Sequence, residues 1–373
     1  MRQLARTLLL LVGIPLIACG PTGSGLDGPV DAGQDGDGGS RSGECASEPV
    51  TEDVSACVPS ATDYQPRSSA DDSWPACISD DNQYHRIAES VSTIARVEAF
   101  DQIAGILWRS GRIPTPEDFI QARVLYAQDQ GLDSRVQRRE DIHYPAPAQD
   151  AKCADMGIPE QYPDRCVGPA KLLPILNESF AHGAQGQSPL LHARRIEAAL
   201  LWFLYVSPLS EVTSCAAKPQ DCDSAWAYYS GGTPRESPAG LAAYVAALGP
   251  ETHHRAYDAT LAVRCWRNLD NETGAASNLA LRDQARAQLD RAMLRGMALI
   301  VRDRFAALHC DEASVAEAEL AFLKVLVPLL DRASRERDPA HADVLLAQVS
   351  KDDPTQVDIE AAQTALDALY ACP

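Results

Sequence analysis

The sequence lacks the short motifs that mark the common catalytic sites. Its 373 residues contain no HExxH pair, no GxxxxGK[ST] phosphate loop, no GxSxG elbow and no GxGxxG following a predicted strand. Strand signals are scarce too, because β-branched residues do not alternate over any long stretch and there is no Asn-Gly hairpin turn. The sequence therefore does not support assignment to the metalloproteases, the nucleotide-binding enzymes or the α/β-hydrolases. We expect a protein that is not an enzyme.

Positive charge is also in short supply. The chain has 33 Lys and Arg against 52 Asp and Glu, a formal net charge of −19, and only five of the basic residues are Lys. Such a surface repels phosphate backbones, so we expect no nucleic-acid partner. It attracts cations, although a solvated acidic surface accounts for the charge equally well.

The N-terminus has the pattern of a lipoprotein signal peptide. Arg2 and Arg6 precede an apolar run over 8–18, which is too short to span a bilayer as a mature helix. Leu-Ile-Ala before Cys19 forms a lipobox, so residues 1–18 are predicted to be cleaved and Cys19 to carry lipid. Residues 19–44 then form a Gly- and Asp-rich tether. We expect a protein anchored in the membrane of the cell envelope, and Gly20 favours the outer membrane.

Cysteine usage agrees with an oxidising compartment. Beyond Cys19 there are ten cysteines, without CxxC or the Cys/His spacing of a zinc site. An even set predicts five disulfides, and a cysteine nucleophile is therefore not expected. Spacing makes Cys153 with Cys166 and Cys215 with Cys222 reasonable pairs.

Helical periodicity dominates the rest of the chain. Residues 45–80 are rich in Pro, Ser, Asp and Cys and are predicted to be irregular, whereas 81–373 are predicted to be one all-α domain. We expect a disulfide-stabilised bundle of about eight to ten helices with no substantial sheet. The expected helices cover 80–112, 115–131, 169–182, 188–208, 238–248, 252–269, 276–309, 312–334, 339–349 and 355–371.

Two pairs of side chains have a spacing that suits a metal ion. His85 and Glu89 are four residues apart, as are Glu178 and His182, so each pair lies on one face of a predicted helix. A nitrogen and an oxygen from each pair could bind iron, manganese or zinc. The alternative is an ordinary surface His–Glu pair.

Two further carboxylates are predicted to point inward. Glu98 continues the apolar stripe of the helix over 80–112, and Glu197 shares a face with Leu201 and Leu204. A buried charge needs a cation, a proton or a metal ion as partner. Glu197 has a simpler account, which is a salt bridge to Arg194 three residues earlier.

A resemblance to a known family rests on residues 222–234, CDSAWAYYSGGTP. Asp223, Trp226, Tyr228 and Tyr229 resemble the D-x-x-W-A-F/Y-Y-x-G stretch of the algal iron-assimilating, high-CO2-inducible periplasmic proteins. The resemblance covers short blocks within 210–373 and a fainter one near 115–126. It implies a secreted protein linked to iron uptake, with Asp223 as a metal ligand to test and nothing catalytic.

A weaker similarity is to the imelysin-like lipoproteins, which are all-α, envelope-anchored and linked to iron. Their Gly-x-His-x-x-Glu signature is not matched, because His85-Arg-Ile-Ala-Glu89 has one residue too many.

Three hypotheses follow. The first is a lipoprotein that binds a metal ion, with iron favoured, through inward carboxylates and histidines. The second is a non-catalytic helical scaffold that binds a protein or a glycan, with the aromatic residues as a docking patch. The third is a hydrolase without a recognisable motif.

Overall fold

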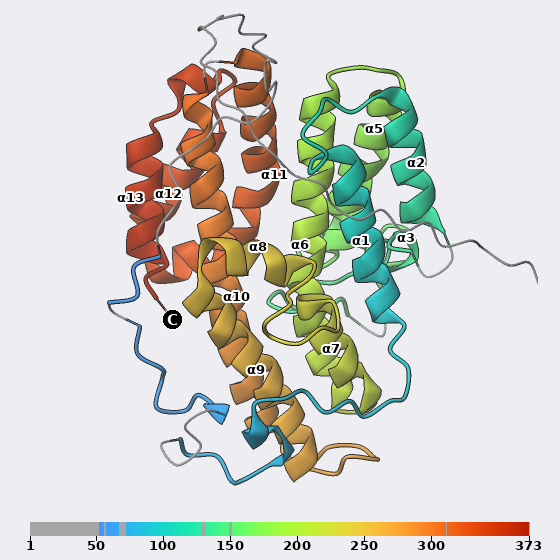
Figure 1. Ribbon diagram of the computed structural model, residues 1–373, viewed down its shortest axis with the longest axis vertical. Helices are drawn as coiled ribbons and strands as arrows, with labels where there is room; N and C mark the ends of the chain where they lie inside the picture. The colour runs from blue at the N-terminus through green and yellow to red at the C-terminus, as the bar shows by residue number, and fades with distance from the viewer. Residues whose placement is uncertain are drawn as a thin grey trace, which may run out of the picture. The chain divides into compact units, whose positions relative to one another are not determined.

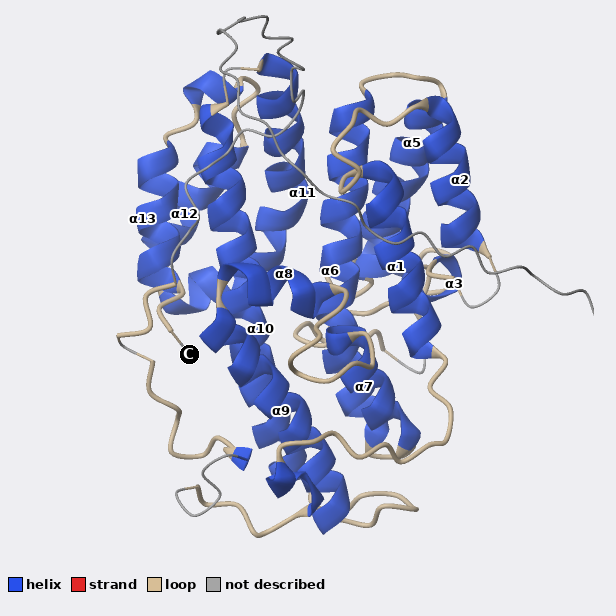
Figure 2. Ribbon diagram, viewed as in Figure 1, coloured by secondary structure: helices blue, strands red, loops and turns tan. Residues whose placement is uncertain are grey.

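The described part of the chain is built from helices. A computed structural model describes residues 52–55, 57–66, 72–128, 131–148, 151–310 and 312–372. These ranges contain thirteen α-helices and no strand (Figures 1 and 2). The all-α prediction is confirmed. The predicted signal peptide, Cys19 and the tether lie outside the described residues.

The helices follow the order in which they were predicted, with three additions. Two additions, α3 and α4, are single turns in the long loop before α5, and the third, α7, contains the Trp-Ala-Tyr-Tyr stretch. The helices are α1 Thr93–Leu107, α2 Pro116–Ala127, α3 Asp133–Val136, α4 Ile158–Gln161, α5 Leu173–Ala184, α6 Pro189–Cys215, α7 Gln220–Ser230, α8 Leu241–Leu248, α9 Pro250–Leu269, α10 Leu279–Ala306, α11 Ala313–Arg337, α12 Pro339–Val349 and α13 Ile359–Leu369.

Local sequence explains the start of α2 and the end of α7. Thr115 caps α2: its hydroxyl accepts from the Asp118 amide, and the Asp118 carboxylate accepts from the Thr115 amide at 2.7 Å. The helix α7 ends at Gly231, whose φ of 73° places it in the left-handed region that glycine adopts without strain. The Gly-Gly sequence at 231–232 therefore ends this helix.

The central helix of the fold is α6. All its residues from 196 to 209 are buried, and it packs against α5 and α7 on one side and α11 on the other (Figure 1). It was expected to end at 208 but continues through Pro208 to Cys215, since packing on all sides compensates for the lost backbone hydrogen bond. Of the described helices, α6 alone is long and apolar enough to cross a membrane, yet 78% of its apolar window is buried within the fold.

Disulfides join distant parts of the chain. The predicted pairs Cys153–Cys166 and Cys215–Cys222 are both present. Two more bridges, Cys57–Cys372 and Cys77–Cys265, tie the segment before α1 to the C-terminus and to α9, and Cys310 is disulfide-bonded as well.

The first predicted helix is wrong in its first half. Within it only Thr93–Leu107 is α-helical, and residues 83–92 form an irregular, bent segment. Its backbone groups bond elsewhere: the Ile87 and Ala88 amides donate to Asp223, and the His85 carbonyl accepts from Arg264. These tertiary bonds replace the i to i−4 bonds that a helix would need.

Candidate functional site

Asp223 lies at the centre of a structural clamp. Its side chain is fully buried and accepts hydrogen bonds from the amides of Ala88 at 2.7 Å and Ile87 at 2.9 Å, and from the Tyr84 hydroxyl at 3.1 Å. Burial raises the pKa of Asp223, while these hydrogen bonds and the charge of Arg264 oppose the rise. Both oxygens are occupied, so the carboxylate fastens the segment before α1 to α7.

Glu197 belongs to a buried ion network. Its carboxylate accepts from Arg194 at 2.6 Å, Arg304 at 2.8 Å and the Tyr244 hydroxyl at 2.9 Å. Glu319 completes the network with contacts of 2.8 Å to Arg194 and 3.1 Å to Arg304. Burial alone would raise the pKa of Glu197, but the charges of Arg304 and Arg194 hold it below its ordinary value. The geometry therefore supports the prediction that the buried charge of Glu197 is balanced by a salt bridge to Arg194.

Glu98 does not point inward as predicted. It is exposed, and the buried face of α1 is formed by Val97, Phe100, Ile103 and neighbouring residues. The prediction extended the stripe from residues before Thr93, and those residues are not helical, so the inferred register was wrong.

His85 and Glu89 do not share a helical face. Both lie in the non-helical segment before α1, where the His85 Nε2 atom contacts the Asp81 carboxylate at 2.8 Å and Glu89 is exposed. The i,i+4 argument therefore does not apply to this pair.

Glu178 and His182 do lie one turn apart on α5, as predicted. Glu178 forms a salt bridge of 3.0 Å with Arg195 of α6. The His182 ring lies beside the ring of His192, also on α6, with 5.1 Å between centroids. Burial, with help from Arg195 and His182, lowers the pKa of His192 to about 4, so this imidazole is neutral at pH 7.

The predicted ligands do not converge on one point. Within the ranges that the structure describes, no group of three or more His, Cys, Asp or Glu side chains is arranged to hold a metal ion. Sequence reasoning missed that His192 lies beside His182, because the two residues are not related by helical spacing. Only the turn between α5 and α6 brings the two rings together.

A pocket of about 420 Å³ lies beside Trp226, in the size range of small-ligand sites. We name it the Trp226 pocket. It brings together a segment before α1, the end of α7 with the following turn, and one residue of α9. Its lining residues are Asp81, Asn82, Gln83, Tyr84, Trp226, Gly232, Pro234, Arg235, Glu236 and Tyr257.

Aromatic rings form part of its wall. Tyr84 stacks on Trp226 with ring centroids 4.3 Å apart and an interplanar angle of 1°. The buried Arg235 guanidinium lies 4.6 Å from the centroid of Tyr257 and donates to the Asn82 side chain at 2.6 Å. Charged, amide and aromatic groups therefore meet in one concave surface.

The wall formed by residues 81–84 is held in place before any ligand arrives. The Cys77–Cys265 bridge fixes it on one side, Arg235 holds Asn82, and Asp223 holds Tyr84. Preorganisation of this kind lowers the entropic cost of binding. Trp226, Gly232 and Pro234 belong to the stretch that carries the family resemblance, whereas the other lining residues had no sequence signal.

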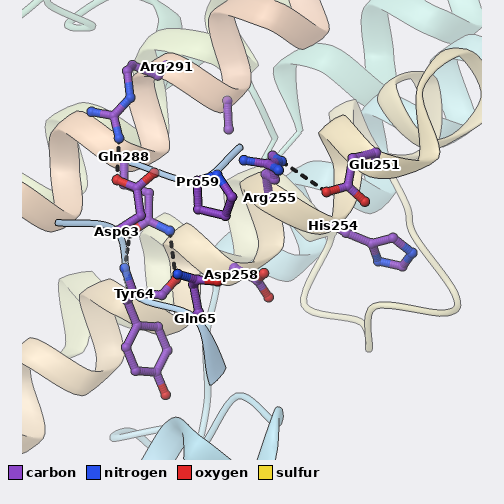
Figure 3. Close-up of a pocket in the computed structure, with 11 residues that line it drawn as sticks. Pro59, Asp63, Tyr64, Gln65, Glu251, His254, Arg255, Asp258, Gln288 and Arg291 are labelled. Atoms are coloured by element: carbon purple, nitrogen blue, oxygen red, sulfur yellow. Dashed lines mark hydrogen bonds and ion pairs between the residues drawn. The ribbon is translucent and has the colours of Figure 1, made fainter. Parts of the chain in front are cut away.

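A second cavity, of about 180 Å³, lies between residues 57–66 and helices α9 and α10 (Figure 3). Its polar groups pair across it: Arg291 contacts the Asp63 carboxylate, and the Gln288 side chain exchanges two hydrogen bonds of 2.9 Å with the Tyr64 backbone. These bonds attach residues 57–66 to helices α9 and α10. We therefore interpret this cavity as part of the packing between them and not as a ligand site.

One partly buried histidine bridges two carboxylates. The Nδ1 atom of His143 lies 2.7 Å from Asp141, and its Nε2 atom lies 2.9 Å from Asp290 of α10. Asp290 also accepts from the Tyr205 hydroxyl of α6 at 2.7 Å. Burial alone would lower the pKa of His143, but the two carboxylates outweigh it and raise the pKa to about 9. The imidazolium therefore joins the long loop before α5 to the core.

Comparison of the chain with protein-family models, with curated proteins and with solved structures finds no match.

Proposed function

We propose that this chain is a lipid-anchored, non-catalytic binding protein of the cell envelope, and that its ligand is a short glycan bound in the Trp226 pocket. The observation that carries the proposal is the meeting of stacked aromatic rings, amides and carboxylates in one preorganised pocket. A sugar presents apolar C–H faces and a rim of hydroxyls, which suit aromatic rings and polar side chains respectively.

Two lining residues are poised to accept or donate hydrogen bonds. Gln83 and Glu236 are exposed, and their side chains make no hydrogen bond or ion pair within the described residues. A carboxylate and an amide in this state can bond ligand hydroxyls without breaking bonds that hold the fold. Arg235, by contrast, is committed to Asn82 and to the fold.

The inward carboxylates give less support to the iron hypothesis. Glu197 is occupied by Arg194 and Arg304, and Asp223 by backbone amides and Tyr84, so a metal ion would have to displace strong bonds at either place. The glycan-binding alternative uses groups that are unpaired within the described part of the chain.

The binding half of the proposal is tested by screening immobilised oligosaccharides and measuring the positives by titration calorimetry. We compare the parent chain with Gln83→Ala and Glu236→Ala. Each substitution removes an exposed side chain, so we expect folding to be unchanged and affinity to fall about tenfold, which corresponds to about 1.4 kcal/mol. The matched control is Glu98→Ala, an exposed carboxylate on α1 that does not line the pocket. Absence of any saccharide ligand, or equal affinity in all variants, would contradict the proposal.

The anchoring half is tested separately. Cys19→Ala removes the predicted site of lipidation, so we expect the protein to move from the membrane fraction to the soluble fraction on cell fractionation. Continued association of this variant with the membrane would contradict the anchor.

A further inference from the structure

Two histidines from neighbouring helices lie side by side at the turn between α5 and α6. The centroids of His182 and His192 are 5.1 Å apart, and the ring planes are inclined by 58°. The chain turns between them through Gly186 and Ser188, which have φ values of 74° and 36°. This reversal places two residues ten positions apart side by side.

Neither ring has a hydrogen-bond partner within the described residues. His192 is only 5% exposed, and its Nδ1 atom is buried without a partner. A buried nitrogen left in this state costs about 1–3 kcal/mol. Most buried polar side-chain atoms in folded proteins are paired, so an unpaired imidazole beside a second imidazole points to a missing ligand.

A carboxylate completes the cluster. Glu178 lies one turn before His182 on α5, so the two share a face, and its present partner is Arg195 of α6 at 3.0 Å. The hydrogen bond and the charge of Arg195 lower the pKa of Glu178.

We propose that His182 and His192 bind a divalent first-row transition-metal ion, with Glu178 leaving Arg195 to serve as a third ligand. Imidazole suits zinc, copper, nickel and ferrous iron, and a carboxylate is compatible with each of them. A tetrahedral ion bound to two imidazoles needs nitrogens about 3.3 Å apart, and the ring centroids lie 5.1 Å apart. Water fills the remaining position.

This site is separate from the Trp226 pocket. It lies at the end of α5 and the start of α6, whereas the pocket is formed by residues 81–84, the end of α7 and α9. Metal binding can therefore fail without affecting glycan binding, and glycan binding can fail without affecting metal binding.

The test is calorimetric titration of the full chain in detergent with Zn²⁺, Ni²⁺ and, without oxygen, Fe²⁺. We expect one ion per chain, and at least tenfold weaker binding in His182→Gln and in His192→Gln. His182 is only partly buried, so we expect His182→Gln to fold. This variant tests the proposal even if His192→Gln does not fold. His341→Gln, which changes a histidine on α12, is the matched control and should bind as the parent does.

Arg195→Gln separates the metal site from simple packing of two rings. The substitution removes a repelling charge and releases Glu178, so we expect metal binding to become severalfold tighter. Electron paramagnetic resonance of the Cu²⁺ complex should show hyperfine splitting from two nitrogens, reduced to one in His182→Gln. The proposal is overturned if no ion saturates the chain below about 1 mM, or if the affinity is the same in His182→Gln.

Discussion

The Asp223 carboxylate accepts a hydrogen bond from the backbone amide of Ala88 at 2.7 Å, which joins α7 to a segment 135 residues earlier in the chain. With the bonds from Ile87 and Tyr84, this contact keeps residues 84–88 out of a helix and holds Tyr84 in the wall of the Trp226 pocket. Asp223 therefore positions Tyr84 in the pocket wall.

Removal of this clamp should loosen the pocket wall. We expect Asp223→Ala to lower the free energy of unfolding by about 3 kcal/mol, because two partly buried amides lose their acceptor. Hydrogen exchange at Ile87 and Ala88 should accelerate in the same variant. Asp221→Ala, a neighbouring carboxylate in the first turn of α7, is the control and should change stability by less than about 1 kcal/mol. Unchanged exchange at both amides would show that the clamp is unimportant.

The buried ion network should behave as one unit. Glu197→Ala leaves Arg194 and Arg304 without a main partner, so we expect the free energy of unfolding to fall by about 3–5 kcal/mol. Glu319→Ala should destabilise the fold as well. The double variant should lose less than the sum of the two, because both glutamates share the same arginines. Strict additivity in urea denaturation would argue against a shared network.

Stability should decline between neutral and alkaline pH because of His143. Its pKa is raised to about 9 in the folded chain, against about 6.5 when unfolded, so its contribution is complete below pH 6.5. The contribution is lost as the pH rises through 9, and the difference corresponds to about 3 kcal/mol. We expect His143→Gln to remove most of this slope from unfolding free energies measured between pH 6 and 10.

The matched variant for this measurement is His341→Gln, in which a more exposed histidine beside Asp338 is replaced. It should retain the full slope. A parent chain whose stability is flat over the same range would rule out the bridging role of the His143 imidazolium.

The long-range disulfide should matter more than the short one. In the chain-entropy model, a bridge across 188 residues restrains the unfolded chain by about 5 kcal/mol and one across seven residues by about 2 kcal/mol. The double replacement Cys77→Ser/Cys265→Ser should therefore be more destabilising than Cys215→Ser/Cys222→Ser in guanidinium denaturation. Equal losses would show that loop length does not set the contribution of these bridges.

The sequence by itself determined what depends on near neighbours. The all-α class, the cap of α2 and the Gly-Gly end of α7 follow from patterns within one or two helical turns. The same holds for the Glu197–Arg194 pair and for the shared face of Glu178 and His182. Cys153–Cys166 and Cys215–Cys222 could be paired for the same reason, because only short loops separate their cysteines.

Features that depend on contacts between residues far apart in the chain were decided only by the tertiary structure. Residues 83–92 have helical periodicity, yet Asp223 and Arg264 take the backbone groups that a helix would use, so the register that placed Glu98 inside was wrong. His192 lies beside His182 because a turn reverses the chain between two helices. The periodicity of a sequence predicts which face of a helix is apolar. It does not predict that a residue far away in the chain will form hydrogen bonds with the backbone of that segment and prevent the helix. The pocket wall and the histidine pair are both consequences of such long-range contacts.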